Sequence, residues 1–124
     1  MILTDELCDR LCESARKKSR EIGIDISFAI SDENGLLRVF RRYGEALVLS
    51  ITLVPGKAYT AAVTQCKTKD VAVCAAEGEA LMAIQTNDPR ITLVAGGIGV
   101  GGGTEKQDCE IAEYVVSVFE KLTR

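Results

Sequence analysis

Residues 96–104 read Gly96-Gly97-Ile98-Gly99-Val100-Gly101-Gly102-Gly103-Thr104, and they concentrate six of the chain's 11 glycines in eight consecutive positions. The stretch stands between an apolar run that ends at Ala95 and a helical pattern from Asp108 to Leu122. Glycine loses more backbone entropy on folding than other residues and has no side chain to pack. A cluster of glycines therefore predicts a place where the backbone turns tightly or where another group approaches it closely.

The same stretch matches the dinucleotide-binding pattern G-x-G-x-x-G through Gly97, Gly99 and Gly102, between a predicted strand and a predicted helix. No complete βαβ unit follows it, and the acidic residue required about 20 positions later would be Glu120, inside a helix. A run so rich in glycine also matches many glycine patterns by chance. Nucleotide binding is thus a weak alternative to a purely structural role.

Composition limits the class of protein. With 124 residues and an apolar share of 47%, the chain is long enough for one globular domain, residues 1–124. A net charge of -3 disfavours nucleic acid as a partner, since phosphate binding depends on clustered Lys and Arg. No apolar run approaches the roughly 18 residues of a membrane span, and the first residues do not resemble a signal peptide, so we expect a cytoplasmic protein without a membrane partner.

The chain contains no histidine, which excludes Ser-His-Asp and Cys-His catalysis, the usual zinc sites and the commonest haem ligand. Its five cysteines are an odd number without any Cys-x-x-Cys motif, which disfavours a disulfide framework. Cys8 and Cys12 are four residues apart on the apolar side of a predicted helix, where cysteine usually behaves as a small hydrophobe. We expect buried thiols, with a metal or redox role as the alternative.

The first third of the chain has clear signals. Thr4 is a plausible N-cap for an amphipathic helix over residues 4–21, and Gly23 is its expected end. Apolar and polar residues then alternate over residues 24–31, which predicts a half-buried strand. Asp32-Glu33-Asn34-Gly35 is a hairpin signal, because Asn-Gly tolerates the positive φ angles of tight turns, and residues 36–42 form the returning strand.

The remainder is less clear. Residues 45–54 are ambiguous between strand and helix, Pro55-Gly56 is expected to break them, and a short helix is predicted over 57–65. The other expected elements are a helix from Thr68 to about Ala83, a turn at 87–89, one long or two short strands over 90–100, and a closing helix over 110–121. This order favours an α+β fold with an antiparallel sheet of about four to five strands and helices packed on it.

Three polar residues are candidates for chemistry. Glu105 and Asp108 are a carboxylate pair that could act as acid and base, although capping the N-terminus of the last helix is the alternative. Lys57 follows Pro55-Gly56 and could meet a ligand anion, although an ordinary surface lysine fits as well.

Five segments in this order resemble the GlcG/HbpS-like family, which includes the C-terminal domain of the PduO protein. The segments are Asp32-x-x-Gly35-x-Leu37, Phe40-x-Arg42 with Ala46, Lys57-Ala58-Tyr59-Thr60-Ala61, Thr86-Asn87-x-x-Arg90-Ile91 and Gly99-Val100-Gly101-Gly102-Gly103-Thr104-x-x-Gln107-Asp108. The resemblance covers nearly the whole chain. It identifies a histidine-free member that is also shortened, since Ile91 is followed almost directly by Gly96 where the family usually has a hairpin.

The resemblance implies a profilin-like α+β domain that forms homo-oligomers, dimers or higher, and that binds haem or another tetrapyrrole in several members. It places six residues at a cofactor pocket: Arg42, Lys57, Thr60, Gly102, Gly103 and Thr104. Lys57 or Arg42 would pair with a propionate, since each presents a cation to a carboxylate. Without histidine, iron ligation would fall to cysteine or to a tyrosine or threonine oxygen, with Cys12 and Tyr59 as the main candidates and Cys8, Tyr43 and Thr60 as others.

Three functional hypotheses follow. The first is a small oligomeric ligand-binding or accessory protein with a tetrapyrrole ligand. The second is an enzyme acting on a small acid or a corrinoid-linked substrate, with Glu105 and Asp108 as acid and base. The third is a structural subunit without a small ligand.

Overall fold

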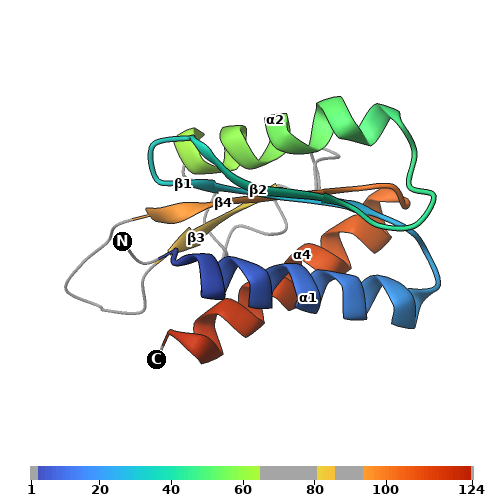
Figure 1. Ribbon diagram of the computed structural model, residues 1–124, viewed down its shortest axis with the longest axis horizontal. Helices are drawn as coiled ribbons and strands as arrows, with labels where there is room; N and C mark the ends of the chain where they lie inside the picture. Colours follow the sequence, from blue (N-terminus) through green and yellow to red (C-terminus); the bar gives the residue numbers. More distant parts are fainter. Residues whose placement is uncertain (1–2, 65–80, 86–93, 124) are drawn as a thin grey trace.

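The computed structural model describes residues 3–64, 81–85 and 94–123. They form a four-stranded sheet with the order β2-β1-β4-β3, in which every neighbouring pair is antiparallel. The strands are β1 (Ser27–Asp32), β2 (Leu37–Arg42), β3 (Leu81–Gln85) and β4 (Val94–Gly101). Helices α1 (Asp5–Ile22) and α4 (Glu105–Leu122) cover one face, and α2 (Leu49–Thr64) covers the other (Figure 1). The α+β fold with an antiparallel sheet is confirmed.

Helix α1 has the ends that its sequence predicts. The Thr4 side chain accepts a hydrogen bond of 3.1 Å from the backbone N–H of Leu7, which satisfies one of the free donors of the first turn. Gly23 ends the helix with φ +88°, the left-handed conformation that favours glycine. None of the described helices combines the length and apolar character of a membrane span.

The β1–β2 hairpin is also confirmed. The Asp32 carboxylate accepts hydrogen bonds from the backbone N–H groups of Asn34 (2.9 Å) and Leu36 (3.0 Å), and Gly35 has φ +81°. An Asp side chain that bonds its own turn in this way stabilises the reversal of the chain.

Strand β1 is buried along its whole length, so the expectation of a half-buried strand was wrong. Ser27, Ala29 and Ser31 do not face solvent but are covered by α2, while Phe28 and Ile30 face α1 and α4. Alternating small polar and large apolar residues are typical of a strand with one wet face. Here the small residues have a different role, because they let a helix lie close to the sheet.

The glycine stretch is the other half of this close contact. Gly97, Gly99 and Gly101 of β4 pair with Ser31, Ala29 and Ser27 of β1, so these two central strands present small residues to α2, with Phe40 of β2 packed beside them. A Cβ added at Gly99 would lie 2.5 Å from the carbonyl oxygen of Val54 in α2. A Cβ at Gly97 would meet the backbone of Ala58 and Ala62. The group that approaches the glycines is therefore α2 rather than a dinucleotide.

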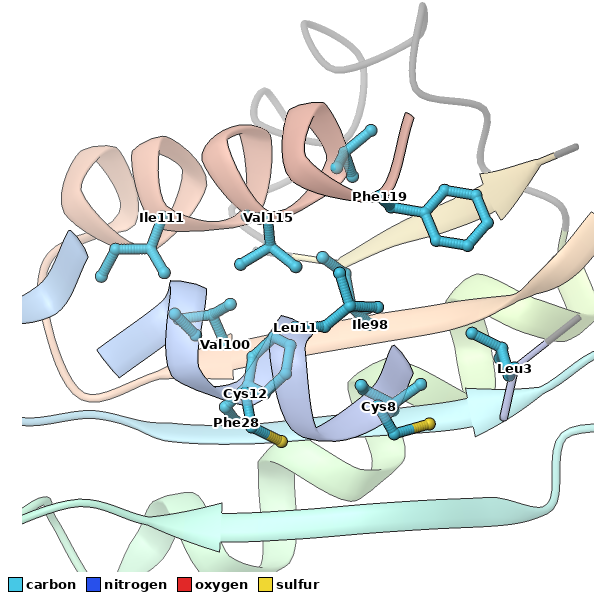
Figure 2. Close-up of a cluster of buried hydrophobic side chains, with 14 of the residues drawn as sticks. Leu3, Cys8, Leu11, Cys12, Phe28, Ile98, Val100, Ile111, Val115 and Phe119 are labelled. Atoms are coloured by element: carbon cyan, nitrogen blue, oxygen red, sulfur yellow. The ribbon is translucent and has the colours of Figure 1, made fainter. Parts of the chain in front are cut away.

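The main hydrophobic core lies on the opposite face of the sheet, between β1, β4, α1 and α4 (Figure 2). Ile98 and Val100 alternate with the glycines of β4 and point into this core. Phe28 and Phe119 are the largest side chains that it buries completely. Cys8 and Cys12 lie within it as free thiols, as expected from their spacing.

Helix α2 is continuous through Pro55 and Gly56, which corrects the predicted break and settles the ambiguity of residues 45–54. A proline in a helix interior costs about 3 kcal/mol because it removes a hydrogen bond and crowds the preceding turn. The helix survives because Val54 on one side of the proline and Ala58, Ala61 and Ala62 on the other are all buried. Breaking the helix would lift one half of this row from the sheet.

Two further expectations are corrected near the C-terminal half. Leu81–Ala83 belong to strand β3, not to the end of a helix. Helix α4 begins at Glu105 rather than at Glu110, because Thr104 and Gln107 form a capping box. The expected helix over 68–80, the turn at 87–89 and the start of the strand at 90–93 lie outside the described residues. The whole connection between β3 and β4, where the family pattern is shortened, also lies outside them.

Candidate functional site

A cleft of about 170 Å³ lies where the N-terminal half of α2 meets the end of β4 and the start of α4. Its floor is the turn Gly101-Gly102-Gly103, and its walls come from α2, the turn before α2 and α4. The described lining residues are Leu47, Leu49, Ser50, Leu53, Val54, Lys57, Gly101, Gly102, Gly103 and Asp108. The glycine turn, the cation of Lys57 and the carboxyl group of Asp108 thus line the same cleft.

Lys57 supplies the cation of the cleft. Its amine donates a hydrogen bond of 3.0 Å to the carbonyl oxygen of Val100 in β4. A Cβ at Gly101 would lie 3.8 Å from this amine and 2.7 Å from the Cγ2 atom of Val54, so the absence of a side chain at Gly101 keeps the cleft open. An ammonium has three donors, and only one is used by Val100.

Asp108 supplies the carboxylate. It is buried, and its Oδ1 atom accepts a hydrogen bond of 2.9 Å from the backbone N–H of Gly103. Burial raises the pKa of Asp108 above its ordinary value, while the Gly103 hydrogen bond and the positive charge of Lys57 act in the opposite direction. A buried acid with a raised pKa beside a cation in a cleft has the character of a functional site.

The raised pKa predicts a pH dependence of stability that Asp108→Asn should remove. Between the unfolded and folded pKa values, the folded chain holds a proton that the unfolded chain releases, so wild-type stability falls as pH rises through this window. Asparagine does not titrate and can still accept the Gly103 hydrogen bond. The difference in the free energy of unfolding between Asp108→Asn and wild type should therefore change in favour of the variant as the pH rises from below ~4 towards neutrality.

Urea unfolding of both proteins across this range measures the effect, and Glu105→Asn is the matched control because Glu105 is exposed. A constant difference between Asp108→Asn and wild type at every pH would contradict a raised pKa at Asp108.

The rim of the cleft is apolar. Leu47, Leu49 and Leu53 line it while remaining largely exposed to solvent. Beside them, the hydroxyl groups of Ser27 and Ser50 form a buried hydrogen bond of 2.6 Å that fixes the first turn of α2 to β1. The cleft therefore has a charged interior and an apolar rim.

The cleft brings together four of the residues proposed from the sequence: Lys57, Gly102, Gly103 and Asp108. Three others have local structural contacts outside the described lining. The Arg42 guanidinium donates to the Ala46 carbonyl (2.8 Å), Thr104 caps α4, and Thr60 lies on the exposed side of α2.

The proposed iron ligands lie elsewhere. Cys12 is buried on the α1 side of the sheet, where the Tyr43 hydroxyl donates to its backbone carbonyl oxygen, and burial raises its thiol pKa to about 12. The Tyr59 ring lies over Gly35 of the hairpin, since a Cβ there would be 2.8 Å from it. Glu105 lines a separate hollow of about 450 Å³ with Cys109.

Sequence reasoning missed the contribution of α2 to the cleft. Ser50, Leu53, Val54 and Lys57 follow the i, i+3, i+4, i+7 spacing of one helix face, which was the available signal. The expected break at Pro55-Gly56 separated Lys57 from the other three.

The described lining residues are better suited to contact the periphery of a cofactor than to bind a metal ion. None of the described lining residues is a cysteine, methionine or tyrosine, and the described residues hold no group of three or more His, Cys, Asp or Glu side chains that could bind a metal ion. The volume is also below the roughly 300–1,000 Å³ of pockets that enclose a drug-sized ligand.

Comparison with known proteins identifies relatives of the whole fold. The chain is 29% identical over 126 aligned residues to an uncharacterized 15.0 kDa protein from the dhaT–dhaS intergenic region of Citrobacter freundii, covering 91% of this chain and 89% of that protein. It is 27% identical to the corrinoid adenosyltransferase PduO of the same organism, covering 99% of this chain but only 41% of PduO.

Among solved structures, a crystal structure of a PduOC–haem complex superposes with a TM-score of 0.78 at 22% identity, covering 93% of each chain. This likeness shows a shared fold. A family model described as haem degrading protein HbpS-like matches residues 3–117. The chain belongs to the HbpS-like family.

Proposed function

We propose that this protein is a small haem- or tetrapyrrole-binding accessory protein that works as a homo-oligomer. The observation that supports this best is the cleft in which Lys57 lies below the exposed leucines 47, 49 and 53. Membership of the HbpS-like family supports this ligand class, and the fold shared with the PduOC–haem complex is consistent with it.

Each part of the cleft suits a part of such a ligand. The Lys57 amine can donate to a propionate carboxylate in a charge-assisted hydrogen bond. The exposed leucines offer apolar surface to the face of a macrocycle. The described residues fit the edge of a tetrapyrrole and not its metal, so we assign no iron chemistry to them.

Titration of the purified protein with haemin is the direct test. We expect a saturable shift of the Soret band with a defined stoichiometry. The shift is monitored by absorbance under oxidising and under reducing conditions. Cys12→Ala and Tyr59→Phe should bind haemin as wild type does, because both residues lie away from the cleft. The absence of a saturable shift in both redox states would refute tetrapyrrole binding.

The buried Asp108 favours a second candidate function, an enzyme acting on a small carboxylic acid. Lys57 would bind the substrate carboxylate, and Asp108 would exchange a proton with it, since its pKa is raised towards the working range of an acid or base. Glu105 does not line this cleft in the described structure, so it is not the partner in this version. The diagnostic is activity that Asp108→Asn abolishes while the variant remains folded.

A further inference from the structure

In the part of the chain that the structure describes, exposed large apolar side chains gather around α2. Five lie on the helix and two in the turn before it, while two more lie at the β1–β2 hairpin, next to Gly35 on which Tyr59 packs. They are Leu49, Ile51, Leu53, Tyr59, Val63, Leu47, Val48, Leu36 and Leu37, with exposed fractions of 44 to 72%. Leu122 at the end of α4 is the remaining one described. We call these nine residues the α2 patch.

The outward side of α2 has no charge. Its exposed positions follow a helical stripe, and Leu49, Leu53, Gly56, Thr60 and Val63 run along its middle. Lys57 is the helix's single charged residue, and its amine points towards β4 rather than outward. By contrast, the exposed side of α1 carries acidic and basic residues along its length.

An apolar surface without charge offers nothing specific to a charged partner but matches a second copy of itself. A two-fold interface requires such self-complementarity, because the same patch meets itself. A contiguous exposed apolar patch of several hundred Å² is often a site of protein–protein interaction.

Gly56 gives the patch a contact point. It is exposed at the middle of the stripe, and a Cβ added there would meet nothing within 4 Å. Glycine is unfavourable in an exposed helix interior, and the described residues offer no steric reason for it at this position, unlike at Gly97 and Gly99. A glycine at such a position allows close approach of a second backbone.

The area agrees with a stable dimer. With on the order of 100 Å² for a fully exposed aliphatic side chain, the α2 patch exposes roughly 500 Å² of apolar surface per chain. A standard interface buries ~800 Å² per partner, of which ~56–65% is apolar, so the patch supplies about the apolar area required.

We propose that the α2 patch is the two-fold interface between two copies of this chain, with α2 crossing its counterpart at Gly56. This names the surface for the self-association in the proposed function and does not depend on haem. Leu47, Leu49 and Leu53 belong both to the patch and to the rim of the cleft. The second copy therefore lies against the cleft and enlarges the enclosed volume for a ligand.

Sedimentation equilibrium without haem tests the interface with matched variants. Wild type is expected to have at least twice the mass of one chain at micromolar concentration. Leu53→Lys places a charge in the patch and should weaken association at least ~100-fold, since it buries an unpaired cation. Leu122→Lys makes the same change on an exposed leucine outside the patch and should leave the mass unchanged.

Gly56→Leu adds an independent test. The single chain has open space for the new side chain, so the variant should remain folded by circular dichroism and yet lose association. A monomeric wild type, or assembly that persists in both Leu53→Lys and Gly56→Leu, overturns the interface. Haemin titration of the same proteins reports separately on the proposed ligand, so a failure of one proposal is distinguishable from a failure of the other.

Discussion

Gly99→Val is expected to lower the free energy of unfolding by about 3 kcal/mol or more, because overpacking that displaces backbone lies at the upper end of such costs. Its Cβ would lie 2.5 Å from the carbonyl oxygen of Val54 and 2.9 Å from the backbone nitrogen of Ala58, and neither atom can rotate away. Helix α2 would have to lift from the sheet, which would also open the cleft. Urea unfolding followed by circular dichroism measures the loss.

Replacement of three different glycines by alanine separates this steric effect from the general effects of removing glycine. Gly99→Ala should be destabilising, and Gly101→Ala should cost less, because its Cβ meets the movable Val54 side chain. Gly56→Ala should stabilise the chain by about 0.5–1 kcal/mol, as alanine does in an open helix interior. All three are made in the Leu53→Lys background, so that subunit association does not contribute. Equal effects at Gly99 and Gly56 would contradict close packing of α2 on β4.

Elements whose signals are local were predictable from the sequence. Thr4 and Gly23 delimit α1, and Asn34-Gly35 marks the hairpin, because caps and turns depend on the residues that form them. The glycine stretch also predicted a close approach. It did not say what approaches, since the answer lies more than 30 residues earlier in the chain.

The two errors at α2 and β1 share one physical cause, which is packing between distant small residues. Pro55-Gly56 breaks a helix in isolation, but the contact of α2 with the glycines of β4 outweighs the local cost. Ser27 and Ser31 have the polar pattern of a wet strand face, and only the covering helix makes them buried. A helix can bury small polar residues as well as large apolar ones, and the hydrophobicity pattern of a sequence does not indicate this kind of burial.

The candidate site was predictable in part for the same reason. Family resemblance pointed to Lys57, Gly102, Gly103 and Asp108, which the cleft brings together. It also pointed to Cys12 and Tyr59, but these residues do not line the cleft: one lies in the core on the far side of the sheet, and the other packs over the hairpin. Sequence motifs place residues along the chain, whereas the face of the sheet is decided by pairing and packing.

Lys57→Glu is expected to produce the largest change in ligand binding, with haemin affinity reduced by more than 100-fold. Hydrogen bonds to charged groups contribute ~1.5–3 kcal/mol, so Lys57→Met, which removes the charged amine and keeps an unbranched side chain, should weaken binding by about 10- to 100-fold. The glutamate adds repulsion towards a propionate. It also replaces the positive charge that lowers the pKa of Asp108, so that pKa should rise further.

Lys121→Glu is the matched control, because it makes the same change of net charge at the far end of α4 and away from the cleft. Circular dichroism and the mass of the assembly must remain those of wild type in Lys57→Met, since the Lys57 amine also donates to the Val100 carbonyl. With fold and assembly intact, equal haemin affinity of Lys57→Glu and Lys121→Glu would place the ligand outside this cleft. A loss confined to the Lys57 variants would instead place the ligand carboxylate at the Lys57 amine, which lines the cleft beside the glycine turn.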